Sequence, residues 1–179
     1  MKKASEIVGL PVMSKTSGKK IAVIKDLVFS RKKFRILALM THEGSVFKEA
    51  KIIKYKNVIS VGKDAIIVDK ENVIESAANI PDIFQLIKER EKIIGEDVIT
   101  ESGENIGIIK DIIIDEDSGK VLGFILSDGL IQDIMDGRNV LPYIYGITFG
   151  KDAMIISDEI KTEFDKNKEY FKKLLELEQ

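Results

Sequence analysis

The side chains that most often carry out chemistry are scarce in this sequence. It contains no cysteine and a single histidine, His42, which excludes thiolate nucleophiles, disulfides and cysteine-based metal sites from it. A general base is recognised by a partner group within hydrogen-bonding reach, and the segment THEGS around His42 reveals none. We interpret His42 as a solvated turn residue that follows a strand.

Carboxylates are the other candidates for chemistry. The segment DEDSGK clusters three of them, Asp115, Glu116 and Asp117. Clustered carboxylates bind calcium, but the EF-hand pattern fails here, because Lys120 stands at the glycine position and the final glutamate is missing. Near Arg138 lie three further aspartates, Asp128, Asp133 and Asp136. No nucleophile, base or phosphate loop accompanies them, so the sequence predicts no enzyme, no metal site and no cofactor.

Basic residues are concentrated in two segments, SRKKFR at 30–35 and KEAKIIKYK at 48–56. Several cations beside exposed aromatic rings suit phosphate contacts and base stacking, which makes these segments a candidate surface for an anionic partner such as RNA. The alternative is a solvated hairpin and an edge strand whose lysines prevent aggregation. The candidate residues are Arg31, Lys32, Lys33, Phe34, Arg35, Lys51, Lys54 and Lys56.

Two phrases occur twice in the same order, and this repeat defines the elements that must position these residues. IKDLVFS at residues 24–30 is repeated as IKDIIID at residues 109–115. GKDAIIV at residues 62–68 is repeated as GKDAMII at residues 150–156. Chance would rarely keep both phrases and their glycines in order over about 70 residues, so we predict a duplicated domain.

The alignment of the two copies, with offsets of 86, then 85, then 88 residues, assigns equivalent structural residues. We expect its paired glycines to lie in turns: Gly18 with Gly103, and Gly62 with Gly150. Asp26 and Asp111 are paired within apolar strands, where an ionised carboxylate is costly unless it is hydrogen-bonded or paired. We expect each to cap backbone amides of a neighbouring turn or to meet a cation.

Each copy is rich in short Ile- and Val-containing runs separated by turn signals. Five or six such strands per copy are typical of a small barrel or sandwich. In the second copy, DEDSGK is a hairpin turn with glycine at the left-handed position. The equivalent SRKKFR has no glycine, so we expect its turn to be of a different type.

Two helices complete the predicted organisation. One spans 79–92 and links the copies, with Pro81 in its first turn. The other occupies the C-terminal tail, where Thr162 and Asp165 make an imperfect capping box and one face carries Phe164, Phe171, Leu174, Leu175 and Leu177. The predicted domains are a first barrel at 1–78, the linker helix at 79–92, a second barrel at 93–160 and a C-terminal helix at 161–179.

Three pairs of segments carry a resemblance to a known family: IVGLPV and IIGEDV, IAVIKDLVF and IGIIKDIII, and YKNVISVGKDAIIV and YIYGITFGKDAMII. Both copies resemble PRC-barrel domains, which occur in the photosynthetic reaction-centre H subunit and in the C-terminal part of the ribosome maturation factor. The resemblance implies a mainly β protein with two tandem small PRC-type β-barrels. It also implies binding and assembly modules without a shared reaction, and it supplies no catalytic residue.

The stretch SDGLIQDIMDGRNVLPY at 127–143 contains an insertion that the first copy lacks. Its apolar residues follow the spacing of one face of a short helix. We expect this helix to cover one mouth of the barrel or to form a ridge that binds a protein partner. The ridge residues are Leu130, Ile131, Ile134 and Met135.

The two copies differ in net charge. Residues 1–78 hold 16 of the 28 basic and 8 of the 30 acidic residues, a net charge of +8, and the remainder carries −10. Such asymmetry favours either attraction between the halves, within one chain or across a homodimer, or an anionic partner of the first half.

These observations together predict a non-enzymatic adaptor or assembly protein, with RNA or ribosome-precursor binding through the basic first barrel as the alternative. The longest apolar run, VLGFIL, is too short to span a bilayer, and no targeting segment is recognised. We therefore expect a cytoplasmic protein without membrane insertion, with partners that the sequence does not name. Its Lys-rich composition is thermophile-like.

Overall fold

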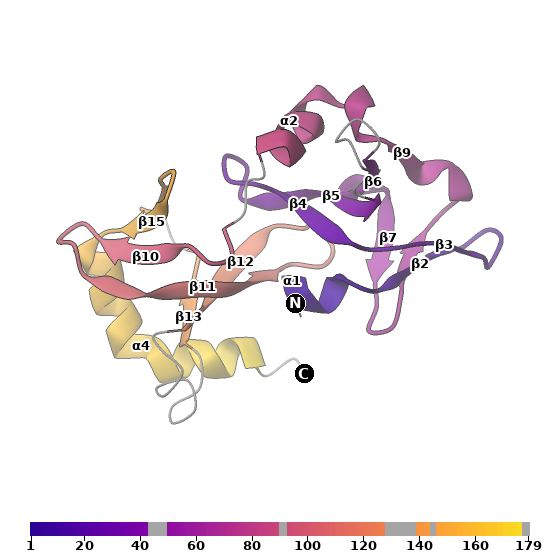
Figure 1. Cartoon of the computed structure of the whole chain (residues 1–179). Helices are drawn as coiled ribbons and strands as arrows, with labels where there is room; N and C mark the ends of the chain where they lie inside the picture. The colour runs from indigo at the N-terminus through magenta and orange to yellow at the C-terminus, as the bar shows by residue number, and fades with distance from the viewer. Residues whose placement is uncertain (43–49, 90–92, 128–138, 144–145, 177–179) are drawn as a thin grey trace. The chain divides into compact units, whose positions relative to one another are not determined.

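The computed structural model describes residues 1–42, 50–89, 93–127, 139–143 and 146–176 (Figure 1). The protein is mainly β, as predicted, and its contacts divide it into two compact units. We call Lys2–Glu91 together with Ile114–Val121 the first-repeat unit. The second-repeat unit comprises Met1, Lys92–Ile113 and Leu122–Gln179. This grouping differs from the predicted domain boundaries at the linker helix and at residues 114–121.

The first-repeat unit contains two four-stranded sheets. One has the order β3-β2-β8-β7, with β2 at Pro11–Ser14, β3 at Lys20–Val23, β7 at Val58–Val61 and β8 at Ile66–Val68. The other has the order β4-β5-β6-β9, with β4 at Asp26–Ser30, β5 at Arg35–His42, β6 at Lys51–Lys54 and β9 at Ile74–Ser76. Short elements complete the unit: β1 at Lys2–Lys3, α1 at Ala4–Ile7, and 3-10 turns at Tyr55–Asn57, Glu71–Val73 and Ala77–Asn79.

Helix α2 (Pro81–Glu89) packs on the second of these sheets, and Figure 1 shows it beside β4 and β5. Its apolar residues Ile83 and Ile87 are buried in a cluster with residues of the sheet. The helix that was predicted as a linker therefore covers the core of the first-repeat unit with its apolar face. The cluster comprises Val28, Ala38, Met40, Ala50, Ile52, Ala77, Ile83 and Ile87.

In the second repeat the strands follow the order β13-β12-β11-β10-β15-β14. A single long strand, β11, replaces the separate β3 and β4 of the first repeat. The strands are β10 at Asp97–Thr100, β11 at Asn105–Ile114, β12 at Val121–Ser127, β13 at Asn139–Pro142, β14 at Thr148–Phe149 and β15 at Ala153–Ile156. Ile113, Ile125 and Val140 form one buried cluster of this sheet.

The duplication is visible in the strand register. β2 pairs parallel with β8, and β10 pairs parallel with β15. β2 also pairs antiparallel with β3, and β10 pairs antiparallel with β11. Both pairings have a register irregularity at the same place, after Val12 in one copy and after Val98 in the other. A bulge redirects a strand at a fixed position, so its repetition supports common descent of the copies.

The paired glycines occupy matching backbone positions. Gly18 and Gly103 have φ angles of 68° and 91°, a region that L-residues with a side chain rarely adopt. Gly62 donates a 2.9 Å hydrogen bond to the carbonyl of Ala65, and Gly150 donates one of the same length to Ala153. Gly18 and Gly103 therefore lie in equivalent loops, and so do Gly62 and Gly150, as the alignment predicts.

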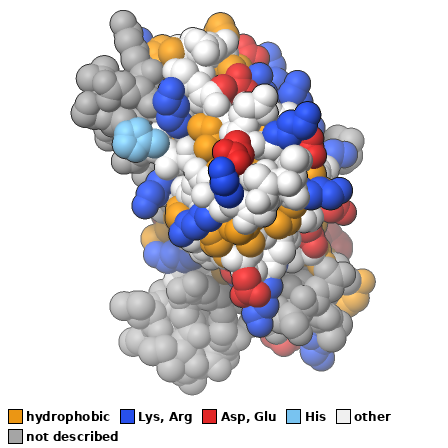
Figure 2. Space-filling model, turned by 90° about the vertical axis from the view of Figure 1, so that its right-hand side faces the viewer, with side chains coloured by type: hydrophobic (Ala, Val, Ile, Leu, Met, Phe, Trp, Pro, Cys, Tyr) orange, Lys and Arg blue, Asp and Glu red, His pale blue; other side chains and the backbone are white. Residues whose placement is uncertain are grey.

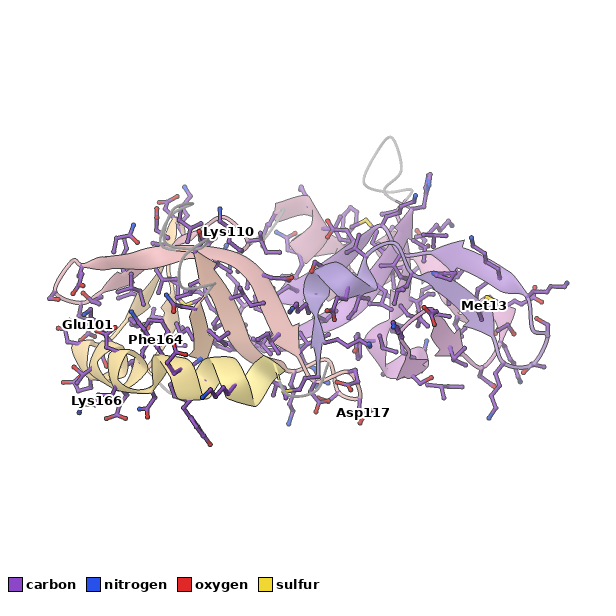
Figure 3. The ribbon with its side chains drawn as sticks, turned by 90° about the horizontal axis from the view of Figure 1, so that it is seen from below. Met13, Glu101, Lys110, Asp117, Phe164 and Lys166 are labelled. Atoms are coloured by element: carbon purple, nitrogen blue, oxygen red, sulfur yellow. The ribbon has the colours of Figure 1, made fainter. Side chains whose placement is uncertain are left out.

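Helix α4 (Asp158–Glu176) lies against β13. Among the helix side chains that the structure describes, Ile160 and Phe164 are buried, and Figure 3 shows Phe164 on the side of the helix that faces the strands, opposite Lys166. The predicted capping box of Thr162 and Asp165 is wrong, because both residues lie inside the helix. The Ser157 hydroxyl accepts a 3.3 Å hydrogen bond from the amide of Ile160, so Ser157 is the N-cap. Leu177 and the side chains of Leu174 and Leu175 lie outside the described part.

Candidate functional site

The tip of the β11–β12 hairpin, residues 114–121, belongs to the first-repeat unit, and we call it the acidic hairpin. It forms an antiparallel bridge to β5 in which Arg35 and Lys120 are partners. Two backbone hydrogen bonds flank the bridge: Ile36 donates to the carbonyl of Gly119 at 2.8 Å, and Val121 donates to that of Phe34 at 3.0 Å. A local β-ladder therefore joins segments that are about 85 residues apart in the sequence.

Two side chains of the first repeat also bind the main chain of the acidic hairpin. The hydroxyl of Tyr55, a residue that is only 4% exposed, donates a 2.8 Å hydrogen bond to the carbonyl of Glu116. The guanidinium of Arg35 donates to the carbonyl of Ser118. Because both acceptors are backbone carbonyls, these two bonds depend on the shape of the turn and not on its side chains.

Gly119 is the point of closest approach between the acidic hairpin and the first repeat. Its φ angle is +71°. A Cβ atom added at this residue would lie 2.9 Å from Cδ1 of Tyr55 and 3.1 Å from the carbonyl oxygen of Ile36. Both the backbone conformation and the available space therefore require glycine here.

The electrostatics of Tyr55 reflect the same neighbours. Burial raises the pKa of its phenol, and the charges of Asp115, Glu116 and Asp117 raise the pKa further, whereas Arg35 opposes them. The Asp115 carboxylate accepts a 2.7 Å hydrogen bond from the amide of Ser118, which is the main reason that its pKa is lowered. Figure 3 labels Asp117 in this hairpin.

The basic hairpin, residues 30–35, has the same turn geometry as the acidic one, so the expectation of a different turn type is wrong. In both hairpins the side chain of the first residue accepts a hydrogen bond from the amide three residues later. These bonds join Ser30 to Lys33 at 3.2 Å and Asp115 to Ser118 at 2.7 Å. Phe34 takes the left-handed position of Gly119, with a φ angle of +48°.

The predicted basic surface is partly engaged within the first-repeat unit. Besides Arg35, Lys54 pairs with Glu75 at 3.1 Å, and Lys33 lies 3.9 Å from Asp82. The exposed cations of the set are Lys32, Lys33, Lys51 and Lys56. In Figure 2, Lys and Arg side chains are spread over the face seen there, with apolar and acidic side chains between them.

Asp26 and Asp111 have the same local role in the two copies. Each carboxylate accepts a 2.8 Å hydrogen bond from the amide of the next residue, Leu27 or Ile112. Asp111 is buried, with 5% of its surface exposed, whereas Asp26 is half-buried. In these two bonds the amides belong to the aspartates' own strands and not to a neighbouring turn.

The remaining candidates form no common site among the residues that the structure describes. His42 lies exposed at the end of β5, and the ridge residues Leu130, Ile131, Ile134 and Met135 lie outside the described residues. Among the side chains that the structure describes, no three His, Cys, Asp or Glu residues are arranged to hold a metal ion. In the same ranges, no helix combines the length and the apolar character that a membrane span requires.

Comparison with protein families gives one result that covers most of the chain. The model of the PRC-barrel domain matches residues 1–72 and 88–160. The protein belongs to the PRC-barrel family. It contains two tandem PRC-barrel regions, as the repeated segments predicted, and comparison with curated proteins found no match.

Proposed function

We propose that this PRC-barrel protein is a non-enzymatic binding and assembly module whose first repeat binds a hairpin of its own chain through the main chain and whose exposed apolar residues bind a protein partner. The docked acidic hairpin is the observation that supports this function. Its recognition combines two amide–carbonyl bonds with two bonds from side chains to carbonyls. In β-strand addition, main-chain hydrogen bonds provide the affinity and side chains provide the specificity.

Exposed apolar residues repeated in both copies support a protein partner. Val8 and Ile94 are 43% and 50% exposed. They occupy equivalent positions, immediately before Gly9 and Gly95, whose φ angles are +95° and +97°. A single exposed apolar side chain needs no explanation, but its repetition in two copies that differ strongly in charge favours the same kind of contact surface on each copy.

Affinity purification of the tagged full chain tests this function, followed by mass spectrometry with and without nuclease. We expect protein partners that survive nuclease and that are depleted by the double substitution Val8→Ser and Ile94→Ser. The matched control replaces Ile59, which is equally exposed at 50%, with serine. Recovery of no protein partner, or of the same partners with the double variant, contradicts the proposal.

RNA binding through the first repeat is the second candidate, and the exposed Lys32, Lys51 and Lys56 favour it. Phosphate contacts depend steeply on salt. Fluorescence anisotropy with a single-stranded RNA should therefore show binding at low salt that the triple Lys→Gln variant loses. Absence of binding at low salt excludes this candidate.

The complementary charges of the copies do not require a homodimer. Arg35 already binds the acidic hairpin within one chain, through the backbone carbonyl of Ser118. We therefore base the proposed function on the hairpin contact and not on self-association, and light scattering at low and high salt tests whether a dimer forms as well.

A further inference from the structure

The contact between β5 and the acidic hairpin is reciprocal under the alignment of the two repeats. With the offset of 85 residues, Ile36 is equivalent to Val121, and Phe34 is equivalent to Gly119. The bond from Ile36 to Gly119 and the bond from Val121 to Phe34 are therefore exchanged by the alignment. The bridge partners Arg35 and Lys120 are also equivalent. Locally, the two segments pair as the two sides of an isologous interface do.

A reciprocal backbone ladder does not by itself choose between partners. The same hydrogen bonds are available to an acidic and a basic hairpin, or to two basic hairpins from two copies of the chain, because both hairpins have the same turn geometry. The choice must come from side chains.

We infer that the surface formed by Arg35, Ile36 and Tyr55 is selective for an acidic hairpin with glycine at its left-handed position, namely residues 115–121 of its own chain, and that it rejects the basic hairpin of a second copy. This inference rests on the proposed main-chain recognition and adds the identity of the partner. The selectivity has a steric and an electrostatic component.

The steric component comes from Tyr55. A basic hairpin bound in the same way would place Phe34 where Gly119 lies. The Cβ atom at that position would be 2.9 Å from Cδ1 of Tyr55, and the tyrosine ring is held by its hydrogen bond to the hairpin carbonyl. The fit therefore excludes a side chain at this point.

The electrostatic component comes from the divergence of the two turns. Three carboxylates of the acidic hairpin lie close enough to Tyr55 to act on its phenol, and Arg35 acts on the same phenol with the opposite sign. Two basic hairpins would instead place Arg35 opposite its own copy, with Arg31, Lys32 and Lys33 on both sides, and like charges that face each other are destabilising. Lys120 also faces Arg35, but Lys120 is exposed and the arginine is directed to the carbonyl of Ser118.

Hydrogen exchange by NMR on the full chain tests the inference, because the amides of Ile36 and Val121 report docking directly. In the variant with Glu116→Lys and Asp117→Lys, we expect these amides to exchange at least about tenfold faster, while the amide of Gly62 is unchanged. Adding Lys32→Glu and Lys33→Glu should restore part of the protection. The matched control changes the same amount of charge at two exposed carboxylates of the first repeat, Asp64→Lys and Asp69→Lys.

The outcomes separate the two levels of the proposal. Rapid exchange of the Ile36 and Val121 amides in the unmodified protein overturns hairpin docking and with it the proposed function. Slow exchange that the charge reversal and Gly119→Ala both leave unchanged overturns selectivity alone. Faster exchange in the charge reversal and in its control alike shows an effect of net charge and also overturns the inference.

Discussion

The hydroxyl of Tyr55 donates a 2.8 Å hydrogen bond to the backbone carbonyl of Glu116, 61 residues further along the chain. Tyr55 follows β6 of the first repeat, and Glu116 lies in the hairpin of the second, yet both are part of one compact unit. The bond thus joins residues that the duplicated sequence assigns to different copies.

Replacing Tyr55 with phenylalanine should destabilise the protein modestly. The ring keeps its packing, but the Glu116 carbonyl loses its donor, which costs about 0.5–1.5 kcal/mol of unfolding free energy. Denaturant unfolding measures the change. Tyr170→Phe is the control, because that side chain is 60% exposed and its substitution should have no effect. Equal stability of the Tyr55 variant and the parent would show that the bond does not stabilise the fold.

Gly119→Ala should be more destabilising than Gly18→Ala. Both glycines have similar φ angles, +71° and +68°, so each substitution carries about 1–2 kcal/mol of backbone strain. At Gly18 an added Cβ meets nothing within 4 Å, whereas at Gly119 it meets the ring of Tyr55. The difference between the two unfolding free energies therefore isolates the steric contact, and equal losses would argue against it.

Stability should decrease in alkaline solution because of Tyr55. Its pKa in the folded protein is raised above the ordinary value of 10.0, first by burial and then by the nearby carboxylates. The unfolded state therefore releases the phenolic proton at a lower pH than the folded state. The stabilisation is complete below pH 10.0 and is lost as the pH rises above that value. Denaturant midpoints between about pH 8 and 11 should fall in the parent and fall less in Tyr55→Phe; parallel curves would contradict this assignment.

Phe164→Ala should destabilise the second repeat strongly. Phe164 is 2% exposed, and deletion of a buried phenylalanine costs about 3–5 kcal/mol. Phe171, on the same helix but only half-buried, provides the matched substitution to alanine, with a smaller expected loss. Thermal unfolding that ranks the two variants in the opposite order would show that α4 packs through its C-terminal part.

The duplicated fold could be predicted from the sequence because its strongest signals are local. Gly18 and Gly103 mark turns that require a positive φ angle, and the Gly-Lys-Asp-Ala segments keep their spacing to the strands. Docking of the acidic hairpin could not be predicted in the same way. Pairing of Arg35 with Lys120 depends on tertiary structure, and no periodicity along the chain reports it.

Two local predictions were wrong for identifiable physical reasons. Phenylalanine rarely adopts a positive φ angle, so nothing in SRKKFR indicated that Phe34 would replace a glycine in the turn. The start of α4 was misplaced because Ser157 and Thr162 are both good capping residues. The apolar face that begins at Phe164 favoured the later one. A useful signal was present in the turns themselves, since Asp115 and Ser30 are both residues that accept backbone amides.

Membership of the acidic hairpin in the first-repeat unit has a consequence for synthesis of the chain. Residues 2–91 are synthesised before residues 114–121. Until then, the ring of Tyr55 and the amide of Ile36 lack the partners that they have in the finished protein. The repeated segment and the compact unit that it folds into are therefore different, because the first-repeat unit is complete only after residues 114–121 have been made.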